Sequence, residues 1–417
     1  MTDRIAVVGT GLIGSALVCA LQQNFSKAEI LWVGGKTEQP RPHSGLDSRV
    51  IACSPSSKKL IDELGVWKKI PEHRIGPYNQ MRVWDYEGTG QVDFSAEERE
   101  LVGVDGEESA DAQLGYILEN AILLEAIQGR IDESPVPVER HIPATVERIQ
   151  QLESSAVTLF LDSGIELEAD LVCAADGANS QLREWAALPV RQWSCQQRAL
   201  TAVVTHTNSH QKTAWQAFLP SGPLAFLPLA KNDNNRTDDQ SQSHCSSIVW
   251  SIDLDSVAEI EQLAEADFLK LLNRYIPSDL GEAISVTTRF GFDLKQSLAQ
   301  KYHQGRILLV GDSAHNIHPL AGQGANLGFS DIAELVSQWQ RAELRGEALW
   351  SDSVMRRYQR QRRWQNQSMA LSMDLFRHGF GVQEPHFRVL RNQIMHLVQG
   401  QSRLKKLITS VAAGSET

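Results

Sequence analysis

The segment from residue 306 to residue 328, RILLVGDSAHNIHPLAGQGANLG, constrains the fold of this chain more than any other. It begins with an apolar run, RILLV, that is typical of a buried strand. The strand leads directly into Gly311 and Asp312, and a proline and glycines follow before a helical pattern starts near Asn326. An acidic strand end followed by glycines and a helix predicts an α/β sheet that binds a ligand at the carboxyl ends of its strands.

The glycines before this helix would let the backbone approach a ligand closely, and the free N–H groups of the first helical turn favour negative charge. This arrangement suits a cofactor with a chain of hydroxyl groups and an anionic ring edge, as in a reduced flavin. For this segment alone, an ordinary strand–turn–helix junction without a ligand is the simpler alternative.

The composition indicates a soluble globular enzyme. A length of 417 residues predicts two domains, and the chain is 42% hydrophobic and 22% charged. No apolar run approaches the roughly eighteen residues needed to span a bilayer. Because the N-terminus enters a strand at once and the five cysteines lack CxxC spacing, we expect no signal peptide, reduced thiols and a cytoplasmic protein. The net charge of −11 argues against nucleic-acid binding.

A second glycine motif, GTGLIG, lies at residues 9–14 between an apolar strand and a helix. In this GxGxxG pattern Gly9 permits a tight turn, Gly11 lets the backbone reach a pyrophosphate, and Gly14 packs helix on strand. The motif therefore predicts dinucleotide binding. The acidic residue expected about twenty residues later, at the end of the second strand, is replaced by Gly34. We expect the adenosine ribose to lose an acceptor there, so that Gly34→Glu would tighten binding.

Two further strand ends carry an acidic residue beside a glycine, in ADG at 175–177 and in GD at 311–312. With GxGxxG they form a set of three in a fixed order, which independent turns do not explain. His315 and His318 have HxxH spacing, but they lie in a predicted loop without further ligands, so we expect no metal site. No GxSxG motif indicates a serine nucleophile.

Between residues 199 and 289 the pattern changes to short alternating strands separated by Pro and Gly. It predicts an antiparallel sheet inserted into the α/β domain. The apolar faces of this sheet, with Trp215, Phe218 and Phe226, would form either a substrate wall or plain sheet core. After Gly328 the chain is almost wholly helical in pattern.

The motifs resemble those of a known family. GTGLIG, DSRVIA (47–52), ADGANSQLR (175–183) and GDSAHNIHPLAGQGANLG (311–328) are similar to motifs of the FAD-dependent aromatic monooxygenases. The form HPLAGQGANLG looks like the ubiquinone-biosynthesis hydroxylases, and the similarity runs nearly end to end. WQAF, SGPLAFLPL and MDLFRHGF look most like the branch that hydroxylates a polyprenylated 3-methyl-6-methoxy-1,4-benzoquinol.

The resemblance implies a p-hydroxybenzoate-hydroxylase-like α/β fold, with a Rossmann-like FAD-binding domain, an inserted antiparallel β-sheet substrate domain and C-terminal helices. We expect a discontinuous FAD-binding domain in residues 1–75, 112–190 and 290–365, a substrate domain in 76–111 and 191–289, and a C-terminal helical segment in 366–417.

The resemblance also implies how FAD is held. The residues expected to bind the cofactor are Gly9, Gly11, Gly14, Arg49, Asp176, Gly311, Asp312 and Asn326. The residues expected to position its isoalloxazine ring are Pro319, Gly322, Gln323 and Gly324. No protein nucleophile is implied.

The implied activity is hydroxylation of the aromatic ring of a polyprenylated phenol or benzoquinol in ubiquinone biosynthesis, with O2 as co-substrate and a flavin C4a-hydroperoxide as oxygen donor. Because a second dinucleotide motif is absent, NAD(P)H or another electron donor would bind only transiently. Membership of a ubiquinone-biosynthesis complex is a further expectation. Two alternatives stay open: a flavin dehydrogenase or halogenase on the same fold, and, given Gly34, an accessory family member that binds FAD poorly.

The C-terminal stretch 386–414 carries apolar residues at helical spacing and five basic residues, but no acidic one. Phe387, Leu390, Ile394 and Leu397 would share one face of a helix. Such a helix can contact the inner face of an anionic membrane or a partner protein, or it can pack on its own domain.

Overall fold

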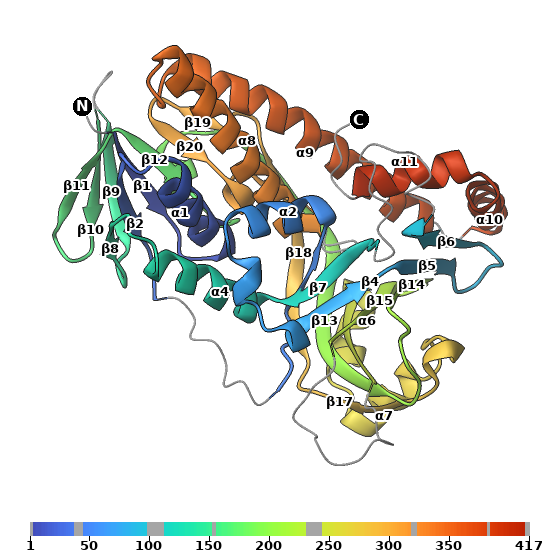
Figure 1. Cartoon of the computed structure of the whole chain (residues 1–417). Helices are drawn as coiled ribbons and strands as arrows, with labels where there is room; N and C mark the ends of the chain where they lie inside the picture. Colours follow the sequence, from blue (N-terminus) through green and yellow to red (C-terminus); the bar gives the residue numbers. More distant parts are fainter. Residues whose placement is uncertain are drawn as a thin grey trace.

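The computed structural model describes residues 3–36, 45–97, 112–151, 156–230, 244–317, 323–381 and 384–412. Within these residues the strands form one sheet of six, one of nine and two of three. In Figure 1 the six-stranded sheet lies at left and the nine-stranded sheet at lower right. A long helix, α9 (Asp352–Gly381), extends along the top from the first sheet toward the C-terminal helices.

The six-stranded sheet has the order β19-β20-β12-β1-β2-β8. Its strands are β1 (Arg4–Val8), β2 (Glu29–Val33), β8 (Val138–His141), β12 (Leu171–Ala174), β19 (His303–Gln304) and β20 (Ile307–Leu309). All neighbouring pairs are parallel except β19–β20. The apolar runs of β1, β12 and β20 are buried almost throughout, because helices and a small sheet cover both faces.

The main hydrophobic core lies between this sheet and the helices that pack on it. These helices are α1 (Leu12–Asn24), α4 (Asn120–Asp132) and α8 (Gln323–Arg345), with α9 packed against α8. A shorter helix, α2 (Pro55–Glu63), starts with a proline, and its cap Ser54 accepts a hydrogen bond from the Ser57 backbone N–H. A serine cap followed by a proline at the first helical position is typical of a helix start.

The nine-stranded sheet has the order β21-β18-β13-β16-β15-β14-β5-β6, and β17 also pairs with β13. Its strands are β5 (Gln80–Asp85), β6 (Gln91–Ser95), β13 (Val190–His206), β14 (Thr213–Leu219), β15 (Gly222–Pro228), β16 (His244–Asp253), β17 (Ala283–Val286), β18 (Phe290–Ala299) and β21 (His315–Asn316). All pairs are antiparallel except β14–β5. The predicted inserted antiparallel sheet is therefore present.

Smaller elements complete the fold. The two small sheets contain β3 (Val50–Cys53), β4 (Ile75–Tyr78) and β7 (Gly115–Glu119), and β9 (Val146–Gln151), β10 (Val157–Leu161) and β11 (Glu166–Ala169). The remaining α-helices are α5 (Gln181–Trp185), α6 (Leu254–Glu261), α7 (Glu265–Leu272), α10 (Pro385–Gln399) and α11 (Ser402–Ala412).

The structure corrects several sequence expectations. The segment 117–131 has the apolar spacing of an amphipathic helix, but its residues 117–119 belong to β7, because they pair with both β3 and β4. Two helices, α6 and α7, interrupt the stretch expected as strands alone. Helix α8 begins at Gln323, three residues before Asn326. The expected boundary at 365/366 falls inside the continuous helix α9.

The two faces of the nine-stranded sheet have different surroundings. Trp215, Phe226 and Trp250 point to the face that α6 and α7 cover, and together with Phe268 they form a second core. Side chains of a strand alternate between faces, so Gln216 and Phe218 of β14 lie on the opposite face. Trp215 and Phe226 are therefore plain sheet core, and Phe218 remains a candidate for a substrate wall.

Candidate functional site

Three strand ends with glycine or acidic motifs lie side by side at one edge of the six-stranded sheet. Strands β1, β12 and β20 are direct neighbours. The Ala175 N–H donates to Val8 O at 2.8 Å, and the Val310 N–H donates to Ala174 O at 3.0 Å, so the pairing continues to the strand ends. Residues near 9, 176 and 311 thus meet at the carboxyl edge, which is where open α/β sheets bind ligands.

The glycine turn after β1 has room for a side chain at only one of its three glycines. Gly9 has φ of +130°, and a Cβ there would lie 2.1 Å from Ala175 O. A Cβ on Gly14 would lie 2.3 Å from Gly9 O, so neither position has room for a side chain. Gly11 has no atom within 4 Å of its would-be Cβ, and it precedes α1 without a side-chain cap. The open helix start fits a pyrophosphate group.

Gly34 directly follows β2, at the position where the ribose-binding acid was expected. It is buried, and its backbone does not need glycine, since its φ lies outside the left-handed region. A Cβ there would lie 2.8 Å from Thr10 Cγ2 and 3.2 Å from Thr10 N. The Thr10 hydroxyl donates to Gly35 O at 3.1 Å. The space that an acidic side chain would need is therefore occupied by Thr10.

Asp176 follows β12 and is partly buried. Its Oδ2 accepts from the Leu182 N–H at 3.3 Å, while Oδ1 is buried and has no hydrogen-bond partner among the described residues. Burial raises the pKa of Asp176 above its ordinary value. An unpartnered carboxylate oxygen at a sheet edge is the kind of group that a ligand hydroxyl or N–H would satisfy.

Arg183, which the sequence analysis missed, ties the second strand end to the third. Its guanidinium donates to Ser313 O at 2.8 Å and to Ala178 O at 2.9 Å. The side chain is 2% exposed, and burial lowers its pKa. The available signal was its place at the end of ADGANSQLR, but its partner lies 130 residues later.

Asp312 lies in a short 3-10 turn, η4 (Gly311–Ser313), that follows β20. Gly311 has φ of +67°, a conformation that favours glycine. The Asp312 side chain reaches solvent, yet desolvation by the surrounding protein raises the pKa of its carboxyl. It is therefore the acidic group at this edge that a bound cofactor could contact.

Arg49 and Asn326 differ in what their side chains contact. Arg49 is partly exposed in the loop before β3, and its Nε lies 3.8 Å from Asp47 Oδ2. Asn326 is buried: its Nδ2 donates to Ala52 O at 2.8 Å, and its Oδ1 accepts from Ser54 N at 3.0 Å. The side-chain amide of Asn326 thus connects α8 with the end of β3 and the cap of α2. These contacts leave its backbone N–H out of account, so cofactor binding by Asn326 stays a prediction.

The expected ring-positioning residues are only partly described. Pro319 and Gly322 lie outside the described residues, as does His318. Gln323 and Gly324 open α8, and a Cβ on Gly324 would meet no atom within 4 Å. No three His, Cys, Asp or Glu side chains in the described ranges are grouped to hold a metal ion.

Gln216 is a polar residue on the sheet face opposite α6 and α7. Its side chain is 6% exposed, and it makes no hydrogen bond to any residue that the structure describes. Across the sheet, its row continues through Ala225 and Val249 to Thr201. The Thr201 hydroxyl lies 3.4 Å from that of Ser48, the neighbour of Arg49. This face therefore extends from Ser48 to the largely buried polar side chain of Gln216.

Comparison with known proteins gives a consistent result. A family model described as an FAD binding domain matches residues 4–371. A 3-demethoxyubiquinol 3-hydroxylase of Escherichia coli is 34% identical over 417 residues, which cover 99% of this chain and 98% of the relative. The mitochondrial ubiquinone biosynthesis monooxygenase COQ6 of Homo sapiens is 27% identical over 454 residues, with coverages of 98% and 92%.

Solved structures share the fold. The crystal structure of the p-nitrophenol 4-monooxygenase PnpA from Pseudomonas putida has a TM-score of 0.75 at 18% identity, covering 100% of this chain and 99% of that chain. This similarity confirms the expected fold class. No helix among the described residues is long and apolar enough to cross a membrane.

Proposed function

Because the chain belongs to the FAD-binding domain family, among the monooxygenases of ubiquinone biosynthesis, we propose that it hydroxylates the ring of a polyprenylated phenol or benzoquinol. O2 is the co-substrate, and NAD(P)H or another electron donor serves as transient reductant. The observation that carries the proposal is the junction of three strand ends with an open helix start at Gly11. The methoxy-methyl-benzoquinol branch is the specific substrate class, supported by the 34% identical hydroxylase.

Different residues of the site bind different parts of FAD. Gly9, Gly11 and Gly14 form the cradle for the pyrophosphate, Asp312 accepts from ribityl hydroxyls, and Arg49 approaches the phosphates. Asp176 offers its unpartnered Oδ1 to FAD or to the reductant. When bound and reduced, FAD supplies the activation of O2, and the oxygen-transfer route expected from the sequence remains part of this proposal. An electron-rich ring needs no protein nucleophile.

We place the substrate ring against the face of the nine-stranded sheet opposite α6 and α7. Gln216 gives a ring oxygen a hydrogen-bond partner, and Phe218 lies on the same face. The apolar surroundings exclude water from the reacting atoms. The domain division expected from the sequence, apart from its boundary at 365/366, belongs to the same proposal. So do a cytoplasmic location with peripheral membrane contact and membership of a biosynthetic complex.

Two measurements test the function. Purified protein is expected to show a flavin spectrum near stoichiometry, and 18O2 is expected to enter the product when a polyprenylated quinol precursor is supplied. A flavin spectrum without 18O incorporation would favour a dehydrogenase, and halide in the product would favour a halogenase. Absence of flavin after reconstitution would favour an accessory protein and would contradict the proposal.

A further inference from the structure

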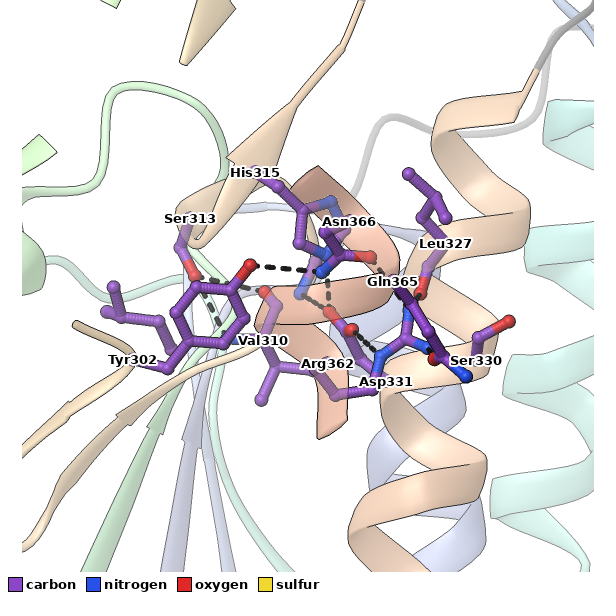
Figure 2. A network of polar contacts seen from close by, with 12 residues as sticks. Tyr302, Val310, Ser313, His315, Leu327, Ser330, Asp331, Arg362, Gln365 and Asn366 are labelled. Atoms are coloured by element: carbon purple, nitrogen blue, oxygen red, sulfur yellow. Dashed lines mark hydrogen bonds and ion pairs between the residues drawn. The ribbon is translucent and has the colours of Figure 1, made fainter. Parts of the chain in front are cut away.

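A buried carboxylate, Asp331 of α8, lies behind the acidic strand end (Figure 2). Its Oδ2 accepts from the Gly311 N–H at 2.8 Å and from His315 Nε2 at 2.6 Å. Its Oδ1 accepts from Arg362 Nε, also at 2.6 Å. Asp331 and His315 are 0% and 1% exposed, so water does not replace any of these bonds.

Arg362 of α9 extends the network away from the sheet edge. Its guanidinium also donates to Leu327 O at 3.1 Å and to Asn366 Oδ1 at 3.0 Å. Asn366 Nδ2 in turn donates to the Tyr302 hydroxyl at 3.1 Å. The network therefore connects α8 and α9 with the segment around β20 and β21, as Figure 2 shows.

The charge on Asp331 is maintained by its partners. Burial alone would raise the pKa of this carboxyl, but interactions and hydrogen bonds with His315 and Arg362 lower it to about 2. Replacing a buried ion pair by apolar residues of similar volume is often neutral for stability. Stability of the fold therefore does not by itself explain a buried charge at this position, next to the sheet edge where a ligand is expected.

Asp331 Oδ2 bonds to one residue before Asp312 in the sequence and to one residue after it. The Gly311 peptide precedes Asp312, and it is held while its backbone has φ of +67°. His315 follows Asp312 by three residues and pairs with Leu298 across β21 and β18. Asp331 thus fixes the turn on both sides of the residue that faces the cofactor.

We propose that Asp331, oriented by Arg362, is a positioning residue for FAD: it holds Gly311 and His315 so that Asp312 meets the cofactor in a single arrangement. The inference uses FAD binding, a property of the family, and does not depend on the identity of the substrate. Asp331 itself touches neither FAD nor substrate in this assignment. It acts on FAD binding by fixing the conformation of the η4 turn.

The test is the affinity of apoprotein for FAD, measured by fluorescence titration together with the melting temperature. Asp331→Asn keeps the size of the side chain but replaces one carboxylate oxygen by an NH2 group, which would face the N–H donors of Gly311, His315 or Arg362. The η4 turn would then lose part of its support, so the Kd for FAD is expected to rise roughly tenfold or more. The matched control is Asp85→Asn, which breaks another buried ion pair, with Arg391 at 2.5 Å, at the β5–α10 contact. This control is expected to lower the melting temperature and to leave the Kd unchanged.

Variants of His315 separate positioning from general stability. His315→Gln retains an N–H donor for Asp331 and is expected to bind FAD like the wild type, whereas His315→Leu is expected to bind it weakly. Equal FAD affinity in Asp331→Asn and wild type, or equal losses in the Asp331 and Asp85 variants, would overturn the inference. Wild-type protein that binds no FAD would instead overturn the proposed function.

Discussion

Single side chains set the limits of the cofactor site, and Thr10 is one of them. Its methyl group and backbone N crowd the position where a Cβ of residue 34 would lie. The Thr10 hydroxyl also holds Gly35 O, so moving the side chain would disturb the end of β2. Threonine at position 10 therefore leaves space for glycine at position 34 but not for a larger residue. The absence of an acid after β2 thus depends on which residue stands in the glycine turn.

This fit changes the effect expected from an acid at position 34. Gly34→Glu alone is expected to bind FAD no better than wild type, because the new Cβ displaces Thr10. In a Thr10→Ser background, which removes Cγ2 but keeps the hydroxyl, Gly34→Glu is expected to tighten FAD binding several-fold through a charge-assisted bond to the ribose. Titration of the apoproteins measures both effects. Tighter binding by the single variant would show that Thr10 is no obstacle.

A buried histidine makes stability depend on pH. His206 is 1% exposed, its Nδ1 donates to Asn208 O at 2.7 Å, and its Nε2 accepts from the Ser246 hydroxyl at 3.0 Å. Burial lowers its pKa from 6.5 to about 4, and His210 and His244 act in the same direction. The unfolded chain therefore takes up a proton below about pH 6.5, and the folded chain does so only near pH 4.

The free energy of unfolding is expected to fall as pH drops from about 6.5 to about 4, by roughly 2–3 kcal/mol from His206. Urea unfolding at pH 7 and pH 4.5 measures this loss. His206→Gln, which cannot titrate, is expected to lose less stability over the same interval. The exposed residue His386 provides the control, since His386→Gln is expected to behave like wild type. An unchanged loss in His206→Gln would contradict the assignment.

At the scale of elements, helix α10 packs on the β5–β6 hairpin mainly through polar side chains. Arg391 donates to Asp85 Oδ2, Arg388 pairs with Glu87, and Met395 is buried against the β5–β6 hairpin. The apolar residues share the opposite side and are about half exposed: Phe387 at 51%, Leu390 at 51%, Ile394 at 52% and Leu397 at 56%. Two arginines of the basic segment thus pair within the protein, and the apolar face is what α10 offers to a surface.

We therefore expect α10 to contact a membrane through apolar side chains more than through charge. A Leu390→Ser/Ile394→Ser variant is expected to co-sediment less with phosphatidylcholine vesicles and to lose more turnover on a long-tailed quinol than on a short-tailed analogue. Its melting temperature is expected to stay the same, because both side chains are half exposed. Ile284→Ser is the control, since Ile284 is 57% exposed on β17. Equal losses on both substrates would show that α10 has no role in handling the tail.

At the scale of the whole molecule, the sequence predicts what depends on neighbouring residues. The turn at Gly9–Gly14 and the acidic strand ends follow from local patterns and appear as expected, and the cap at Ser54 depends likewise on adjacent residues alone. The sequence does not predict contacts between distant segments. Residues 117–119 suit a helix or a strand equally well, and pairing with β3 and β4 makes them a strand.

The candidate site shows the same division. The sequence singles out Asp312 because it follows a strand, whereas it does not reveal Asp331, whose partners lie on three other elements. In the sequence, Asp331 looks like an ordinary polar residue of a helix. The contacts of the Asn326 side chain were missed for a related reason: its motif indicates a ligand loop, but its amide bonds to Ala52 and Ser54, more than 270 residues earlier.

The position of β20 in the six-stranded sheet has a consequence for biosynthesis. Residues 307–309 complete the sheet beside β12, so about three quarters of the chain leaves the ribosome before β12 gains this neighbour. Until then, the four apolar residues of β12 present an unpaired strand edge, which is a template for association with other nascent chains. Asp312 follows the same late strand by three residues, so the edge is closed at the same stage of synthesis at which the proposed acidic contact for FAD appears. On this proposal, a newly made chain binds FAD only after the edge of β12 has been covered.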